Sequence, residues 1–209
     1  MEILYSDDRV VVCVKPQGIL STDEPGGLPE LIRKALGDEK AVVKTVQRLD
    51  RAVGGIMVLA RTARAASDIS KQIETGLFEK EYTAVAYGFP PAQGLLKDYL
   101  KRDPVRKMTY VVPKEEKDAR IARLSYQVLD TNSQFSKVWV RLETGRTHQI
   151  RVQFSSRGWP LVGDRKYADR QDECNIALWS TRLVFYHPRT GKKMEFRLEP
   201  PDQYPWNSF

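Results

Sequence analysis

A single carboxylate set between two arginines is the feature of this sequence best suited to chemistry. Asp50 stands between Arg48 and Arg51, and a short apolar run with strand propensity follows them. The Gly54-Gly55 pair, which precedes the apolar residues, gives the backbone room for a tight turn or for the close approach of another group. This layout is typical of a charged site on a loop that a buried strand anchors. A surface aspartate paired with its neighbouring arginines is the simpler alternative for this stretch alone.

A second dense group of polar residues follows a predicted strand near residue 145. A helix is expected over residues 146–157, so that free backbone amides and the Arg146 side chain form a natural anion site at its start. His148 and Arg151 are three residues apart and would share one face of that helix. From there Arg151 could reach a carboxylate on a different element. For His148 alone, a structural hydrogen-bonding role competes with catalysis.

Other familiar chemistries have no motif in this chain. There is no phosphate-binding loop, no dinucleotide-binding glycine pattern and no serine nucleophile elbow. The only cysteines and histidines are Cys13, Cys174, His148 and His187, and they lack the spacing of a zinc site. We therefore expect no metal and no organic cofactor. A carboxylate that acts beside a sugar suits glycosidic chemistry at an anomeric carbon.

The positive charge of the chain is concentrated in two segments. The formal net charge is +7. Residues 97–123 hold nine basic and five acidic residues, a net charge of +4, and residues 146–170 hold six basic and two acidic residues, again +4. Such concentration is the pattern expected of a protein that binds a phosphate backbone. Together with glycosidic chemistry, this charge distribution predicts that the substrate is a nucleoside within a nucleic acid. The alternative is that the two basic segments are simply solvent-exposed surfaces without a binding role.

The order of apolar patterns predicts one domain over residues 1–209. Many hairpins with a few interspersed helices indicate an α+β fold, with a mostly antiparallel mixed β-sheet flanked by helices. The expected strands span residues 3–5, 10–14, 80–88, 123–129, 135–142, 176–179, 183–187 and 194–198, with a polar hairpin over 97–112. Helices are expected over 28–36, between Thr62 and Gly76, and over 146–157. The prolines at 200 and 201 are expected to end the ordered structure.

Location and assembly are predicted from what the chain lacks. No run approaches the ~18 consecutive apolar residues of a membrane span. The N-terminus has no basic-then-apolar order typical of a signal peptide, and two lone cysteines suit a reducing compartment. We therefore expect a cytoplasmic protein with no membrane partner, and a monomer by default.

Five segments of the chain together resemble the RluA-type pseudouridine synthases. Gln47-Arg48-Leu49-Asp50-Arg51, with Gly55 after it, resembles the His-Arg-Leu-Asp-Arg…Gly signature of that family. The other segments that resemble family motifs are, in family order, residues 15–18, 80–84, 144–151, and 158–164 with Tyr167. Any one of these motifs is weak, but five in order are specific.

The resemblance implies isomerisation of uridine to pseudouridine in ribosomal or transfer RNA, without a cofactor. Asp50 matches the catalytic aspartate, and Tyr82 matches the tyrosine that stacks on the uracil and is proposed to take the proton from C5. Arg151 matches the basic residue that pairs with the aspartate. Taken alone, Tyr82 could be a core aromatic and Arg151 a surface charge. Residues expected to contact RNA are Arg48, which matches the base-extruding arginine, and Arg51, Lys101, Arg102, Arg106, Lys107, Arg146 and His148.

The sequence also departs from the family pattern around the aspartate. Gln47 stands where the family usually has histidine, and Val53-Gly54 where it usually has Thr-Ser. Glutamine can hydrogen-bond but cannot titrate near neutrality. The additional N-terminal S4-type RNA-binding domain of some relatives is expected to be absent. Two other functions therefore stay open: a catalytically silent RNA-binding or RNA-folding protein on the same fold, and a nucleic-acid N-glycosylase.

Overall fold

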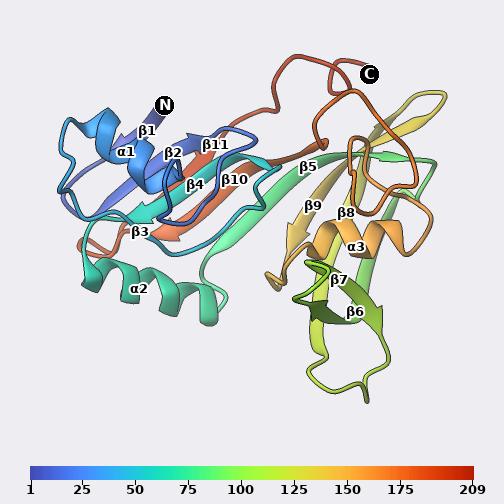
Figure 1. The fold of residues 1–209 in the computed structure, drawn as a ribbon, viewed down its shortest axis with the longest axis horizontal. Helices are drawn as coiled ribbons and strands as arrows, with labels where there is room; N and C mark the ends of the chain where they lie inside the picture. The colour runs from blue at the N-terminus through green and yellow to red at the C-terminus, as the bar shows by residue number, and fades with distance from the viewer. The chain divides into compact units, whose positions relative to one another are not determined.

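Eleven strands and three helices form in the computed structural model, which describes all residues from Met1 to Phe209. They divide between two units. Unit 1 comprises Met1–Lys80 and Trp179–Glu199, and unit 2 comprises Glu81–Leu178 and Pro200–Phe209. The elements of both units are labelled in Figure 1. That the whole chain works as one catalytic domain stays a prediction.

Unit 1 is built on a sheet in which the strand after Asp50 is central. The strand order is β1 (Glu2–Ser6), β2 (Val10–Lys15), β4 (Gly54–Ala60) and β10 (Leu178–Tyr186), with β3 (Lys44–Thr45) paired to β4 and β11 (Lys193–Arg197) paired to β10. These pairings are antiparallel except that of β4 with β10. The parallel pairing joins Gly54 to Trp179 and Gly55 to Ser180.

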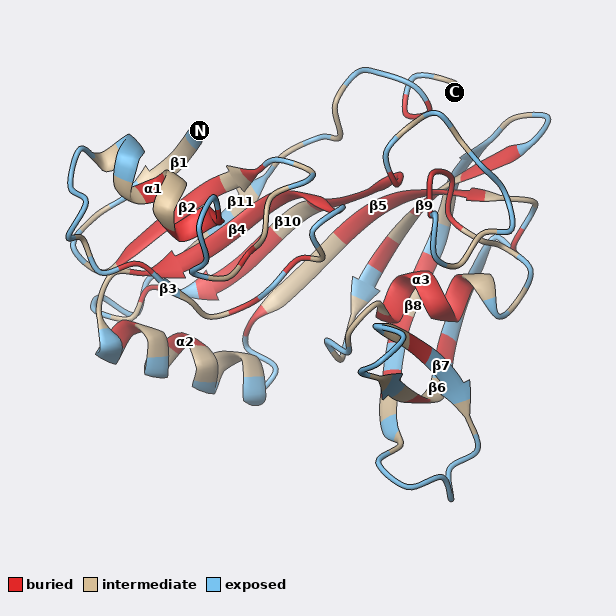
Figure 2. Cartoon of the chain, in the orientation of Figure 1, coloured by how far each residue is buried: buried red, intermediate tan, exposed pale blue.

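Strand β4 is buried along its whole length, as Figure 2 shows in red, so both faces of the sheet are covered. Helix α2 (Ala63–Glu74) covers one face, where Ile69 packs in a cluster with Val58 and Phe185. The helix starts at the predicted cap, because the Thr62 hydroxyl accepts a hydrogen bond from the Ala65 amide at 3.0 Å. Helix α1 (Leu28–Leu36) lies on the other side of these strands (Figure 1).

Unit 2 is an antiparallel sheet with one buried helix. The strand order is β5 (Glu79–Tyr87), β9 (Phe135–Leu142), β8 (Arg120–Thr131), β6 (Gln93–Asp103) and β7 (Met108–Val112). Helix α3 (Gln149–Ser155) packs on this sheet through Phe154, whose ring meets that of Tyr126 edge-on at 5.4 Å between centroids. Every residue of α3 from Gln149 to Phe154 is buried, so the helix is an internal element.

The predicted α+β class with mostly antiparallel pairing is confirmed. Two strands predicted around residues 176–187 are instead one, β10, because Ser180 pairs with Gly55 and Arg182 with Arg197 across the gap. The prediction that order ends at the two prolines was wrong, since Trp206 is buried and its amide donates to the Gln203 carbonyl at 2.7 Å. No helix combines the length and apolar character needed to cross a membrane.

Candidate active site

Asp50 lies on a tight turn that leads into β4. The Val53 amide donates to the Asp50 carbonyl at 2.9 Å, which closes the turn, and Asp50 itself is partly exposed. The next residue ties the turn to the loop after β2 in both directions. The Gly18 amide donates to the Arg51 carbonyl at 2.8 Å, and the Arg51 Nε donates to the Gly18 carbonyl at 2.9 Å. The turn is therefore fixed to residues far from it in the chain.

Lys15, at the end of β2, holds the same turn from inside the unit. Its side chain is fully buried, and its Nζ donates to the carbonyls of Pro16 at 2.9 Å, Arg51 at 3.2 Å and Val53 at 2.7 Å. An ammonium has three protons, so each can be matched to one carbonyl. Burial lowers the pKa of Lys15 to about 8, although the nearby Asp50 carboxylate acts in the opposite direction. Sequence reasoning missed this role, although Lys15 begins one of the five motif-like segments.

Ser21 holds the residue before the aspartate. The buried Ser21 hydroxyl donates to the Leu49 carbonyl at 2.8 Å and accepts from the Leu49 amide at 3.1 Å. Both polar backbone groups of the buried Leu49 are thus satisfied by one side chain. Asp50 is therefore preceded and followed by backbone that buried side chains fix in place, which is more support than a surface carboxylate requires.

The glycine pair after the turn lies against the start of β10. Gly55 has a φ of +114°, and a Cβ there would lie 2.4 Å from the Ser180 carbonyl oxygen, so both conformation and space require glycine. At Gly54 a Cβ would lie 2.3 Å from Cζ3 of the Trp179 ring. The departure from the family pattern at this position thus has a steric reason, because the indole fills the space of a side chain.

In unit 2 the Arg151 guanidinium forms a buried, two-point ion pair. Its Nε and Nη2 donate to the two carboxylate oxygens of Asp164 at 2.8 and 2.7 Å. Both side chains are almost wholly buried, and the guanidinium also lies 5.2 Å from the Tyr167 ring centroid. The carboxylate that the Arg151 guanidinium reaches in this way is that of Asp164, whereas the pairing of Arg151 with Asp50 stays a prediction. Asp164 was not predicted as a partner, although it lies in one of the motif-like segments.

The prediction that His148 shares a helical face with Arg151 was wrong. His148 caps α3 with a left-handed backbone, φ 55°, and the helix begins only at Gln149. The two residues meet instead at Tyr167, whose hydroxyl lies 2.7 Å from the His148 Nδ1. That hydroxyl also accepts from the Thr109 amide at 2.7 Å. Burial raises the pKa of Tyr167, so the phenol keeps its proton at neutral pH.

The anion site expected at the start of the third helix is occupied by the chain itself. The Arg146 amide donates to the Gln149 Oε1 at 3.0 Å, and the same oxygen accepts from the Thr144 hydroxyl at 2.8 Å. The amide expected to bind a phosphate is therefore already satisfied, and the helix starts later than residue 146. The Arg146 side chain is exposed while its Nε donates to the Ile121 carbonyl at 3.0 Å. Its contact with RNA stays a prediction.

Tyr82, the third predicted catalytic residue, lies on β5. It is buried, with 5% of its surface exposed, and pairs with Val140 on β9. Tyr82 and Arg151 therefore belong to unit 2, whereas Asp50 belongs to unit 1. That the three side chains meet stays a prediction.

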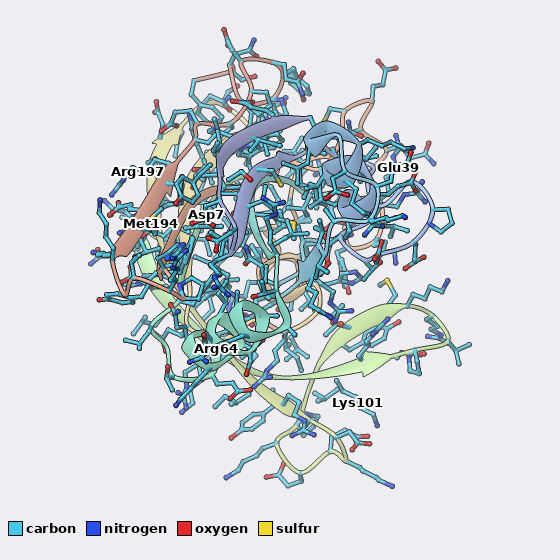
Figure 3. All side chains as sticks on the ribbon, turned by 90° about the vertical axis from the view of Figure 1, so that its left-hand side faces the viewer. Asp7, Glu39, Arg64, Lys101, Met194 and Arg197 are labelled. Atoms are coloured by element: carbon cyan, nitrogen blue, oxygen red, sulfur yellow. The ribbon has the colours of Figure 1, made fainter.

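The predicted basic hairpin forms between β6 and β7 of unit 2. Lys101, labelled in Figure 3, lies on β6 and forms an ion pair with Glu116 at 2.5 Å. Arg106 and Lys107 are exposed at the turn. The Lys107 carbonyl accepts from the Lys166 Nζ at 2.9 Å, which ties the turn to the segment after α3. The remaining residues predicted to contact RNA, Arg48, Arg51 and Arg102, are exposed.

Comparison with known proteins links these features to one family. Residues 9–156 match the family described as RNA pseudouridylate synthase. The chain is 34% identical over 221 residues to the ribosomal large subunit pseudouridine synthase C of Buchnera aphidicola, which covers 97% of this chain and 68% of that protein. It is 32% identical over 208 residues to the dual-specificity RNA pseudouridine synthase RluA of Escherichia coli, covering 93% and 91% of the two chains.

Two further comparisons concern length and fold. The chain is 38% identical over 160 residues to an uncharacterized RNA pseudouridine synthase of Chloroflexus aurantiacus, which is 75% of this chain but only 49% of that protein. The solved structure of human RNA pseudouridylate synthase domain containing 1 has a TM-score of 0.84 at 20% identity, covering 99% of this chain and 86% of that one. A likeness at this identity shows the same fold.

Proposed function

Since the chain belongs to the RNA pseudouridine synthase family of isomerases, we propose that it converts a specific uridine of a structured RNA to pseudouridine, with Asp50 as the key catalytic residue. The observation that carries this proposal is the support of the Asp50 turn. Lys15 fixes the backbone after the aspartate, and Ser21 fixes the residue before it. Preorganisation of this kind is what a reacting carboxylate needs and a solvated one does not.

The proposed reaction rearranges one nucleotide without loss or gain of atoms. The bond from ribose C1′ to N1 of uracil breaks, the base turns, and C1′ bonds to C5. The proton on C5 leaves, and N1 takes up a proton. Asp50 acts at C1′ or C2′ of the ribose or at the base, where charge develops as the glycosidic bond breaks. Tyr82 stacks on the uracil and takes the C5 proton, and Arg151 pairs with the aspartate.

Binding of RNA has to compensate for extrusion of the target base. Removing a base from its stack costs a few kcal/mol. We assign Arg48 to the vacated stack and the exposed charges of the β6–β7 hairpin to phosphates, whose neutralisation releases counterions. The 2′-hydroxyl provides the means to prefer RNA over DNA. The name of the Buchnera relative supports ribosomal RNA as substrate, and transfer RNA fits the same chemistry.

The test is release of tritium from RNA labelled at C5 of uridine. Unfractionated ribosomal and transfer RNA serve as substrates, and we expect release with the wild-type protein and none with Asp50→Ala. Asp38→Ala is the matched control, because Asp38 is an exposed carboxylate of the same unit. Release by Asp50→Ala at the wild-type rate would contradict the assignment of the catalytic residue.

Two other products of the same experiment distinguish the alternatives. Free uracil in place of retained base indicates an N-glycosylase. Binding of RNA without release from any substrate indicates a catalytically silent RNA-binding protein. The observation in favour of the silent protein is Gln47, which replaces the usual histidine and whose Nε2 is buried without a hydrogen-bond partner.

A further inference from the structure

The ring of Trp179 and the missing side chain of Gly54 occupy the same volume. A Cβ built on Gly54 lies 2.3 Å from Cζ3, 2.8 Å from Cε3 and 2.9 Å from Cη2 of the indole. No real Cβ approaches ring carbons this closely, because the distances lie well inside van der Waals contact. Trp179 is 9% exposed, so the ring is enclosed and cannot simply swing into solvent. The two residues are therefore sterically matched.

The backbone of Gly54 does not itself require glycine. Gly54 begins β4, and its φ lies outside the left-handed region, unlike the φ of +114° at Gly55. A Cβ on Gly55 would meet the backbone of Ser180, which no side-chain change can move. At Gly54 the three atoms nearest to such a Cβ all belong to the Trp179 side chain. The requirement for glycine at Gly54 thus depends on the identity of residue 179.

The matched pair lies where the chain leaves the Asp50 turn. Val53, whose amide closes the turn and whose carbonyl accepts from Lys15, is the residue before Gly54. Gly54 and Trp179 also form the first pair of the short parallel ladder between β4 and β10. A displacement of Gly54 away from the ring would therefore pass directly to Val53 and to the turn.

We propose that Trp179 is a positioning residue for Asp50, which it fixes by packing its indole against the bare backbone of Gly54. This inference rests on the proposed function, because it assumes that Asp50 reacts. The ring acts through the backbone and takes no part in proton transfer. A side chain at Gly54 with the tryptophan retained displaces the turn, and a smaller residue at 179 restores the space.

The experiment is a double-mutant cycle of Gly54→Ala and Trp179→Leu, measured by tritium release at saturating RNA. Since a displacement of about 1 Å can cost 10²-fold in rate, we expect Gly54→Ala to lower kcat at least about tenfold. The KM for RNA should stay at the wild-type value, because the RNA-binding residues are unchanged. The double variant should be at least about fivefold faster than Gly54→Ala, since residues in contact do not act additively.

Gly55→Ala provides the matched control for rescue. Because the Ser180 backbone blocks a Cβ there, Trp179→Leu should not restore the activity of Gly55→Ala. Each kcat is divided by the folded fraction from circular dichroism, so that loss of stability alone cannot imitate the effect. A Gly54→Ala variant with wild-type kcat, or losses that simply multiply in the double variant, would overturn the inference. If Asp50→Ala is inactive in the same assay, that result leaves the proposed function standing; if it is active, both proposals fail.

Discussion

The Lys15 Nζ lies 2.7 Å from the Val53 carbonyl oxygen, inside unit 1 and against the turn that carries Asp50. This ammonium is fully buried, and the oxygens it donates to are backbone carbonyls. Backbone carbonyls cannot move independently of the chain, so the charge orders the turn itself. The same burial lowers the pKa of Lys15 to about 8, which makes the order of the turn depend on pH.

The first prediction is that catalysis declines as Lys15 loses its proton. A neutral amine donates only two hydrogens, so above its pKa of about 8 one of the three carbonyls loses its partner. We expect kcat to fall with an apparent pKa near that value. Lys15→Met, which keeps an unbranched stem, should lower kcat about tenfold or more and lack this pH dependence, because a misplaced turn slows the chemical step. The measurement is kcat against pH at saturating RNA.

Stability should respond to the same proton in the opposite direction. The folded-state pKa of Lys15, about 8, is below its ordinary 10.5, so the unfolded chain binds more protons between these values. Unfolding free energy of the wild type, relative to Lys15→Met, should therefore rise with pH through that window. Urea titrations of both proteins check this. A difference that falls with increasing pH would mean that the fold raises the pKa of Lys15 above 10.5 instead of lowering it, so that the hydrogen bonds of the ammonium outweigh its burial.

The second prediction concerns the other support of the turn. Ser21→Ala leaves the buried amide and carbonyl of Leu49 without their partner. Because such groups bear their full desolvation penalty, we expect a loss of about 1–3 kcal/mol in unfolding free energy. Thr22→Ala is the matched control, since that hydroxyl makes an exposed hydrogen bond to Glu24, and it should change stability by less than about 0.5 kcal/mol. Equal effects of the two variants would remove Ser21 as a support.

Where the sequence predicts the structure well, the signal is local. The N-cap at Thr62 predicts the start of α2, and the alternating residues predict the β8–β9 hairpin. Both predictions succeed because residues close together in the sequence determine these elements. The burial of Lys15 has no local signal, since its partners on the Asp50 turn are 36 and 38 residues away in the chain. Lysine side chains are mostly exposed in folded proteins, so the residue type alone predicts an exposed side chain at position 15.

The error at α3 has the same origin. An apolar pattern predicts a helix from residue 146, yet the Gln149 side chain takes the Arg146 amide and satisfies it outside the helix. The left-handed backbone of His148 then sets the helix start. Whether a side chain or the helix backbone binds such an amide depends on the tertiary fold, and the periodicity of apolar residues does not reveal it. The contacts of Ser21 with Leu49 and of Asp164 with Arg151, which support the candidate site residues, could therefore not be predicted from the sequence.

The third prediction tests the buried ion pair of unit 2. Asp164→Asn removes the two-point partner of the Arg151 guanidinium from an interior site. Breaking a buried pair by changing one partner costs about 3–5 kcal/mol, so we expect a loss of that size. Asp23→Asn is the matched control, because Asp23 receives two hydrogen bonds from Arg33 at the surface and should lose no more than about 1 kcal/mol. Chemical denaturation of both variants measures the difference, and similar losses would contradict the account of Arg151.

The fourth prediction is that Tyr167 anchors the basic hairpin. Tyr167→Phe removes the hydroxyl that accepts from the Thr109 amide and contacts His148. The loss of this partly buried hydrogen bond, about 1 kcal/mol, should raise local opening of β7 several-fold. Hydrogen exchange at the amides of Met108–Val112 measures it. Tyr186→Phe, on the exposed end of β10, should leave that exchange unchanged, and unchanged exchange in Tyr167→Phe as well would show that the hairpin is held by other contacts.

The fifth prediction assigns phosphate contacts to the hairpin turn. Arg106 and Lys107 are exposed there. Because the Lys107 carbonyl accepts a hydrogen bond from Lys166, the backbone that bears the two side chains has a defined position. Replacing both with glutamine should weaken RNA binding at low salt and reduce the slope of log K against log salt by about 1 per charge removed. The effect should be similar for different RNA sequences, because phosphates carry no base information.

Arg64 supplies the control for this charge removal. It lies on α2 of unit 1 with 88% of its side chain exposed, and both it and Lys101 of the hairpin are labelled in Figure 3. Arg64→Gln changes the net charge of the protein but none of the residues predicted to contact RNA, so the salt slope should stay at the wild-type value. A slope that falls in Arg64→Gln by as much per charge removed as in the hairpin variant would mean that RNA responds to the total charge of +7 and not to the hairpin. At saturating RNA the hairpin variants should keep the wild-type kcat, because their lost contacts bind substrate and transition state alike.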